Sequence, residues 1–395
     1  MEHLRPASGT AIRRLSRRQL LAGLGATGVG AIGLAACTGD GGGSGGASTE
    51  PASRSSSSGT SEEATGPIVW ANWPAYIAKG TLQGFERSSG IHVDYKTPIN
   101  DNDEFLAVIG DDLDAGHPIG YDIITMTSWV TAQLLDKGVL QPFGPVEGAD
   151  RVISSLATPN WDPEQRYSMP WQAGLTGIAY DARRVDRAIG SIAELFERKD
   201  LAGGVGMLTE LSDTLGMVLL GRGHSLSDLS EDDLDASIDY LRSRSDAGQF
   251  AGFYGNNFMK GLRNGTLTAS LAWSGDVLQE QLKNPYLKFV VPEEGLLIWS
   301  DDLLVPRGST QAAAVAELAA YYYQPEVAAR VAAWVNYICP VEGAREAMTK
   351  VAPDLVDNPL IFPDGSINEV SYLFPNLPIE MFDRVSQSFS EIAGT

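Results

Sequence analysis

The chain has little of what many catalytic and nucleic-acid-binding proteins depend on. Its 395 residues include two cysteines, which are too few for a disulfide framework, and four scattered histidines, none at zinc-ligand spacing from another ligand. Lys and Arg number 29 against 50 Asp and Glu, and no basic cluster follows the N-terminus, which argues against a nucleic-acid partner. A nucleophile elbow and a phosphate-binding loop are also lacking. These absences predict a protein that uses no cofactor or metal, although paired acids could still hydrolyse a glycoside.

The N-terminus carries a targeting segment. Arg17 and Arg18 lie in a pattern that resembles a twin-arginine export signal, and residues 34–37 resemble a lipoprotein processing box ending in Cys37. We predict that residues 1–36 are a signal peptide and that lipidated Cys37 anchors the exported chain to the cell membrane. A permanent transmembrane anchor is the alternative. Residues 37–66 contain so much Gly and Ser that we expect a disordered tether.

Beyond the tether, short apolar strands alternate with helices. Residues 68–70, 91–95 and 121–125 have the apolar character of buried strands, and residues 81–89 and 103–110 between them are typical of helices. This alternation predicts an α/β fold with mainly parallel sheets that are flanked by helices. The length of the chain allows two domains.

Aromatic and hydroxyl side chains follow several of these strands. In open α/β sheets ligands bind at the carboxyl ends of the strands. A single Trp is more often a core residue, but several aromatics at strand ends beside acids are not explained by core packing. These residues are Trp73, Tyr76, Thr127, Trp129 and Trp273.

Four further residues suggest a site for a cation. Trp299 and Asp301 are expected at a junction between two short buried strands, where alternation places both side chains on one side. A cation there would meet an aromatic face and a negative charge together. Glu210 and Asp213 begin a predicted helix. The alternatives are a core Trp beside a turn Asp, and two acids that only cap a helix.

With these residues in order, the chain from about residue 68 onwards resembles the spermidine/putrescine-binding lipoproteins of ABC importers, which have the type II periplasmic-binding-protein-like fold. The most specific similarities are Asn72-Trp73 with Tyr76, Tyr121-Asp122 with Thr127 and Trp129, residues 167–170, and Trp299 with Asp301 before a Leu-Leu-Val-Pro strand. The resemblance implies two lobes joined by hinge strands, with residues 67–173 and 298–342 in one lobe and residues 174–297 and 343–395 in the other. Residues 167–180 are expected to form the first hinge strand.

The resemblance also implies a function. A monomeric binding protein, which is not an enzyme, would capture a polyamine between the lobes and deliver it to the permease of the importer. The residues implied to bind the ligand are Trp73, Tyr76, Thr127, Trp129, Glu210, Asp213, Trp273, Trp299, Asp301 and Tyr337. Two departures leave the identity of the amine open: the region of Glu210 and Asp213 has one acid fewer, and a glutamine of the family has no clear counterpart around Phe374. Trp129 also stands where the family usually has a Tyr. The alternatives are another cationic amine, an amino-acid-like solute, or a secreted hydrolase.

Overall fold

The structure is a computed structural model that describes residues 66–394. The predicted signal peptide, the predicted lipidation site Cys37 and all but the last residue of the predicted tether lie outside the described residues, so these assignments stay predictions. Within residues 66–394, no helix has both the length and the apolar character that a membrane span requires.

Eight strands follow one another across a mixed sheet in the order β2-β1-β3-β10-β5-β8-β6-β7. We call the part of the sheet formed by β2, β1 and β3, with its helices, the first half. These strands pair in parallel, and helices connect them. The first half comprises β1 (Ile68–Ala71), α1 (Thr81–Ser89), β2 (Val93–Lys96), α2 (Asn102–Ala115), β3 (Ile123–Thr127) and α3 (Ser128–Asp136), and β4 (Leu140–Gln141) pairs with β10 beside it.

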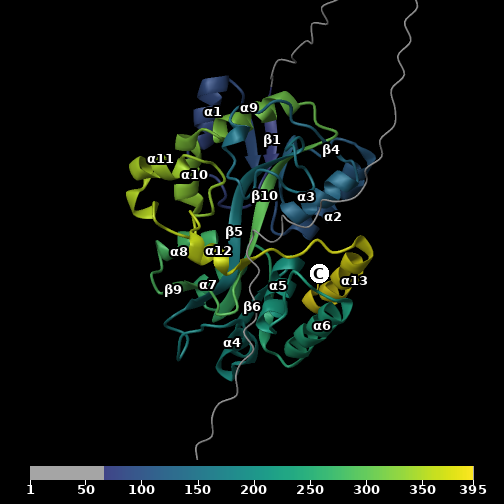
Figure 1. Ribbon diagram of the computed structural model, residues 1–395, viewed down its shortest axis with the longest axis vertical. Helices are drawn as coiled ribbons and strands as arrows, with labels where there is room; N and C mark the ends of the chain where they lie inside the picture. Colours follow the sequence, from purple (N-terminus) through teal and green to yellow (C-terminus); the bar gives the residue numbers. More distant parts are fainter. Residues whose placement is uncertain (1–65, 395) are drawn as a thin grey trace, which may run out of the picture. The chain divides into compact units, whose positions relative to one another are not determined.

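The other side, which we call the second half, repeats this arrangement, since β6 pairs in parallel with both β7 and β8. Its elements are α4 (Ile192–Glu197), β6 (Val205–Leu208), α5 (Leu211–Gly221), α6 (Glu231–Asp246), β7 (Phe250–Tyr254), α7 (Phe258–Asn264), β8 (Ala269–Trp273), α8 (Ser274–Gln281) and β9 (Leu287–Val290). Figure 1 shows α1 and β1 at the top and α4 and β6 at the bottom.

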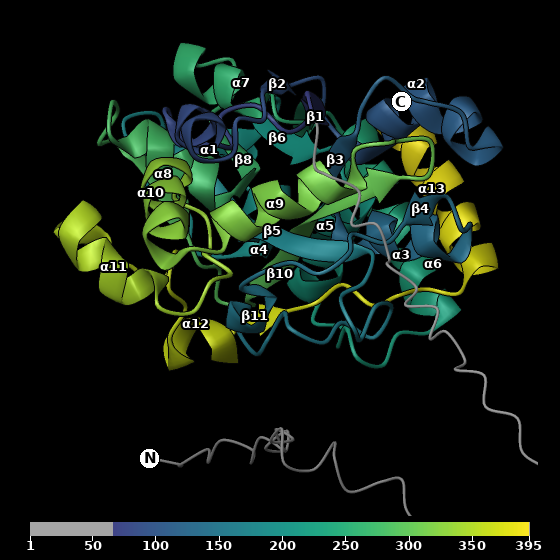
Figure 2. The same ribbon diagram turned by 90° about the horizontal axis from the view of Figure 1, so that it is seen from above.

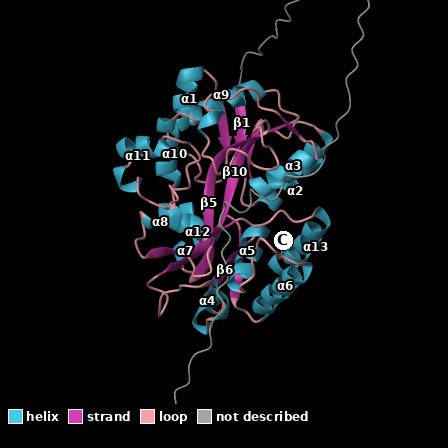
Figure 3. Ribbon diagram, viewed as in Figure 1, coloured by secondary structure: helices cyan, strands magenta, loops and turns pink. Residues whose placement is uncertain are grey.

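Two long strands connect the halves, β5 (Ser168–Asp181) and β10 (Leu296–Pro306) (Figure 3). They are antiparallel to each other, and β10 is antiparallel to β3 as β5 is to β8. The sheet is therefore parallel within each half and antiparallel in the middle. All 14 residues of β5 are buried, which confirms the strand predicted over residues 167–180. The predicted division into two lobes stays a prediction.

The expected strand junction at Trp299 and Asp301 is wrong, because both residues lie inside β10. The chain turns earlier, between β9 and β10, where Gly295 has a φ of 117°. From Leu297 onwards β10 pairs with β5 and then also with β3, so these residues belong to one strand and not to a junction between two. A shift in register between Asp301 and Asp302 is the one irregularity in the β10–β5 pairing.

The C-terminal part of the chain adds helices on both sides of the central strands. In Figures 1 and 2, α8, α10 and α11 lie to one side of β5 and β10, while α2, α3, α6 and α13 lie to the other. Cys339 is buried among these elements. The C-terminal elements are α9 (Ala312–Tyr322), α10 (Pro325–Val335), α11 (Ala344–Val351), α12 (Gly365–Glu369), β11 (Ser371–Tyr372) and α13 (Ile379–Ala393).

Candidate functional site

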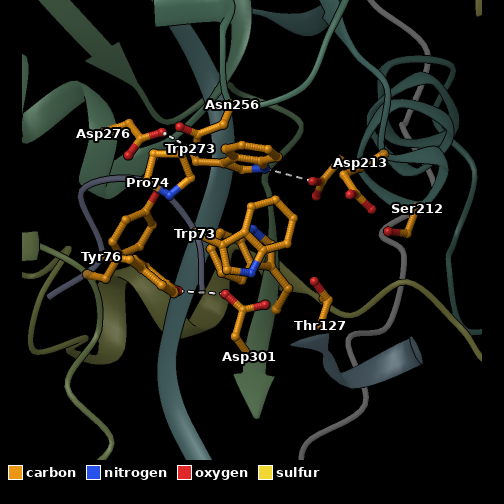
Figure 4. A pocket seen from close by; sticks show the side chains of 13 residues that line it. Trp73, Pro74, Tyr76, Thr127, Ser212, Asp213, Asn256, Trp273, Asp276 and Asp301 are labelled. Atoms are coloured by element: carbon orange, nitrogen blue, oxygen red, sulfur yellow. Dashed lines mark hydrogen bonds between the residues drawn. The ribbon is translucent and has the colours of Figure 1, made fainter. Parts of the chain in front are cut away.

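A cavity lies where residues of the first half face residues of the second half. The space between its walls that no atom fills, open solvent at the mouth included, is about 440 Å³. Its walls combine aromatic rings with carboxylates (Figure 4). The residues that line it are Trp73, Pro74, Tyr76, Thr127, Glu210, Ser212, Asp213, Asn256, Trp273, Asp276, Trp299, Asp301 and Tyr337.

Nine of the ten predicted site residues line this one cavity, and strand ends account for much of the convergence. Thr127 is the last residue of β3 and Trp273 the last residue of β8, and Trp73 follows β1 by two residues. Glu210 and Asp213 begin α5, while Trp299 and Asp301 come from β10. Residues more than 260 positions apart in the sequence thus share one cavity.

Trp129 is the exception, because it does not line the cavity. It lies in the first turn of α3, and its ring packs against Phe382 of α13 with 5.4 Å between the ring centroids. Its indole nitrogen is buried without a hydrogen-bond partner among the described residues. Proximity to Thr127 in the sequence suggested a shared site, but β3 ends between the two residues and the helix turns Trp129 toward α13.

The aromatic side chains form a continuous wall. The Trp273 ring lies 6.0 Å from Trp73 and 6.4 Å from Trp299, both in edge-to-face geometry. Tyr337 lies 5.6 Å from Trp299 and 5.1 Å from Tyr76. The edge-to-face pairs among these rings stabilise the wall, and the rings line the cavity where a ligand can contact them. The wall can therefore contact a methylene chain or a cation.

One group of lining residues, which we call the Asp301 end, consists of Asp301 and Asp276 with Tyr76 and Tyr337, which contact each other between them. The Tyr76 hydroxyl donates a hydrogen bond of 2.6 Å to Oδ2 of Asp301. Oδ1 of Asp301 has no hydrogen-bond partner within residues 66–394, although the residue is only 3% exposed. Burial raises the pKa of Asp301 to about 7, and the hydrogen bond from Tyr76 opposes that rise. A buried acceptor of this kind is costly unless a donor reaches it.

The other end, which we call the Glu210 end, contains Glu210 and Asp213. Asp213 accepts hydrogen bonds from Trp273 Nε1 at 2.8 Å and from Thr176 Oγ1 at 2.7 Å. Thr176 in turn accepts a hydrogen bond from Trp299 Nε1 at 2.9 Å. Burial raises the pKa of Asp213 to about 6 while the two hydrogen bonds lower it. Burial also raises the pKa of Glu210 well above its ordinary value, and hydrogen bonds from Asn102 oppose this rise.

The sequence analysis missed four of the lining residues, Pro74, Ser212, Asn256 and Asp276. Asp276 is the most important of them, because burial raises its pKa to about 7 and Asn256 Nδ2 lies 3.3 Å from its Oδ2. A signal was present: Asp276 follows a strand end and lies in the first turn of α8, just as Asp213 lies in the first turn of α5 after β6.

The walls therefore present four carboxylates and, among the described residues that line the cavity, no Lys, Arg or His. No group of acids, histidines and cysteines suited to a metal ion is found in residues 66–394. Carboxylates that are desolvated beside aromatic rings, without a cation of the protein, suit a cationic ligand with donor hydrogens.

Comparison with known proteins agrees with this chemistry. The family model of bacterial extracellular solute-binding proteins matches residues 63–363. A spermidine/putrescine-binding periplasmic protein of Escherichia coli is 22% identical over 301 residues, which cover 75% of this chain and 83% of the relative. A putrescine/agmatine-binding protein of Pseudomonas aeruginosa is 26% identical over 335 residues, which cover 78% and 87%.

Solved structures show the same fold. The spermidine/putrescine ABC transporter substrate-binding protein PotD of Streptococcus pneumoniae has a TM-score of 0.67 at 21% identity, covering 82% of this chain and 98% of that chain. The binding protein AgtB of A. tumefaciens R10, in complex with agropinic acid, has a TM-score of 0.66 at 17% identity, covering 83% and 98%. These neighbours confirm the predicted type II periplasmic-binding-protein fold.

Proposed function

We propose, from the premise that this chain belongs to the family of bacterial extracellular solute-binding proteins, that it captures a polyamine in the cavity and delivers it to the permease of an ABC importer. The observation that carries the proposal is Oδ1 of Asp301, a buried carboxylate oxygen without a partner among residues 66–394, in a cavity whose charged lining groups are all acids. An ammonium group supplies both the donor hydrogen and the positive charge that this oxygen lacks.

Each part of a polyamine has a counterpart in the walls. One ammonium lies at the Asp301 end between Asp276 and Asp301, and a second lies near Asp213. The methylene chain between them packs on the wall of indole rings, where each buried CH₂ contributes about 0.8 kcal/mol. A desolvated cation beside an aromatic ring adds about 0.5–2 kcal/mol. These contributions act together only when water is excluded, so binding favours the closed arrangement of the two halves.

We extend the proposal to the organisation of the whole chain. The two lobes have the predicted boundaries, and β5 and β10 serve as the hinge between them. Residues 1–36 direct export by the twin-arginine route, and Cys37 carries the lipid anchor. The family is extracellular by its description, which suits these assignments.

A solute that carries a carboxylate is the competing candidate, since one structural neighbour was solved with agropinic acid. Such a ligand needs a cation to hold its carboxylate, and the lining residues provide none. We therefore favour an amine without an acidic group.

A thermal-shift panel tests the proposal directly. Putrescine, spermidine, spermine and agmatine are compared with γ-aminobutyrate, neutral amino acids and choline at equal concentration. We expect the amines with two or more cationic groups to raise the melting temperature, because a ligand that binds only the folded state stabilises it. A shift with γ-aminobutyrate but not with putrescine would contradict the proposal. Turnover of a glycoside or an amide by the purified protein would favour a hydrolase instead.

A further inference from the structure

Three sets of hydrogen bonds connect the first half directly to the second half. Asn102 donates to both oxygens of Glu210, from its backbone nitrogen at 2.8 Å and from Nδ2 at 3.0 Å. Thr209 Oγ1 donates to Oδ2 of Asp101 at 3.1 Å. The backbone nitrogen of Asn256 donates to the carbonyl oxygen of Asn100 at 2.8 Å. We call residues 100–102, 209–210 and 255–256 the latch.

The two carboxylate oxygens of Glu210 differ from those of Asp301 in what they contact. Both accept hydrogen bonds from Asn102, which belongs to α2 of the first half and does not line the cavity. Asn102 is fully buried and Glu210 is 6% exposed, so the contact is shielded from water. The Glu210 side chain makes no hydrogen bond to the end of its own helix. Its partners are thus on the opposite half rather than in the cavity or on α5.

The packing of Gly255 provides independent evidence that the halves are in close contact here. A Cβ atom on Gly255 would lie 2.4 Å from the carbonyl oxygen of Asn100. The position has no need of glycine for its backbone angles, because its φ is not among the positive values. The glycine is therefore required only by the approach of the other half.

We propose that Glu210 is a positioning residue that holds the two halves together when the cavity closes, and that it does not bind an ammonium group of the ligand. The latch raises the fraction of protein in the closed, binding-competent state. Every amine then gains affinity by the same factor, because a pre-organised state benefits all ligands alike. This inference rests on the proposed function for its ligands, whereas the latch itself is a contact between parts of the protein.

Affinities measured by calorimetry for E210A, N102A and the double variant test the assignment. Buried donors of Asn102 that are left without an acceptor correspond to about tenfold or more in affinity, so we expect E210A to weaken putrescine and spermidine binding equally by about tenfold. N102A keeps the backbone donor and should lose less. In the double variant we expect no loss beyond that of E210A, because both substitutions remove the same contact. If the losses of E210A and N102A add in the double variant, or if the loss differs between putrescine and spermidine, Glu210 contacts the ligand and the proposal is overturned.

Gly255→Ala provides a variant that removes no polar group. The added methyl collides with Asn100 only when the halves meet, so each half should fold normally while the affinity for both amines falls about tenfold. Gly110→Ala is the matched control, since a Cβ there meets no atom within 4 Å, and it should bind as the parent protein does. Unchanged affinity in G255A would contradict the latch.

Hydrogen exchange separates failure of the latch from failure of the proposed function. In the protein without added amine, the backbone N–H groups of Asn102 and Asn256 should exchange faster in E210A and G255A than in the parent chain. If the parent protein binds no polyamine, the proposed function fails and this comparison still decides on the latch. Equal exchange in the parent and both variants would overturn the latch even where polyamines bind.

Discussion

The two ends of the cavity have the same charge but differ in how far the protein itself satisfies their carboxylates. At the Asp301 end, one oxygen of Asp301 has no partner among residues 66–394, while Asp276 has a long contact to Asn256 and a hydrogen bond from Tyr337. At the Glu210 end, each of the four carboxylate oxygens of Glu210 and Asp213 accepts a hydrogen bond from the protein. The Asp301 end therefore depends on a ligand, while the Glu210 end is largely satisfied without one.

This difference assigns separate tasks to the two ends. A ligand that completes the Asp301 end relieves the cost of an unpaired buried carboxylate, so most of the binding energy should depend on that end. Asp213 still carries lone pairs and a negative charge, and it lies on the far side of the Trp273 indole from Asp276 (Figure 4). The contribution of Asp213 to affinity should therefore depend on whether the ligand has a second ammonium and on the distance between its two ammonium groups.

Asp301→Asn should produce the largest loss. The substitution keeps the shape and leaves an oxygen to accept from Tyr76, but it removes the charge that faces the ammonium. Truncating one partner of a buried charge pair costs about 2–5 kcal/mol, so we expect the dissociation constant for putrescine to rise about 100-fold or more by calorimetry at pH 8.

Asp302→Asn is the matched control for that variant. Asp302 is the next residue of β10 and is equally buried at 4% exposure, but it does not line the cavity. It should bind putrescine within about twofold of the parent protein, as is usual for residues without ligand contact. If D301N and D302N behave alike, the Asp301 end has no special role.

Asp213→Asn should have a smaller and more selective effect. The charge is lost, but Trp273 and Thr176 of the protein already donate to both oxygens of Asp213, so we expect putrescine to weaken by roughly 10–30-fold. A monoamine such as butylamine should bind the parent and the variant equally, because its one ammonium lies at the Asp301 end. An equal loss for butylamine would mean that both ends share the same ammonium.

Trp299→Leu tests what the two ends have in common. Its ring belongs to the wall between them, so we expect a loss of about tenfold or less that is the same for putrescine, spermidine and agmatine. Trp299→Phe keeps a ring and removes only the N–H donor to Thr176, and it should recover most of the affinity. A loss confined to one amine would show instead that Trp299 determines the length of the ligand.

The sequence could predict the strand-end residues of the site better than the residues near helix starts. The apolar runs before Trp73, Thr127 and Trp273 identify buried strands, and parallel strands present their carboxyl ends at one edge. This reasoning also identified the α/β class. It could not show that β10 is one strand of 11 residues, because pairing with β5 and β3 depends on residues far away in the sequence.

Contacts between distant segments explain the remaining differences. Trp129 turns toward Phe382, a partner that nothing near residue 129 indicates. Asp276 was missed because an acid in the first turn of a helix is most simply a favourable charge at the helix dipole. Its proximity to Tyr337 depends on Gly275, where a Cβ atom would lie 2.3 Å from the tyrosine ring. Tertiary packing of this kind cannot be derived from periodicity.

The pH dependence of binding should be the smallest effect, and it compares the two ends without mutation. Burial raises the pKa of Asp276 and Asp301 to about 7 but that of Asp213 only to about 6. Between pH 7 and 8 the ionised fraction of each acid at the Asp301 end rises roughly from one half to nine tenths, so affinity should increase about twofold per acid. Calorimetry at pH 7 in buffers of different ionisation enthalpy should show protons released on binding, and D301N should release fewer. Binding without proton release would mean that these acids are already charged.

The same pKa values give the protein without ligand an unusual dependence of stability on pH. The unfolded chain releases the protons of these acids near pH 4, whereas the folded protein retains them until about pH 6 for Asp213 and about pH 7 for Asp276, Asp301 and Asp302. The folded state therefore binds more protons in this window, and these acids make the free energy of unfolding fall as pH rises from about 4 to 7 and level off above. Because a bound diamine favours the charged forms, saturating putrescine should flatten this slope in melts followed by circular dichroism. D302N should remove part of the slope both with and without putrescine. D301N should remove only the part of the slope that putrescine suppresses, because of these two residues Asp301 alone lines the cavity.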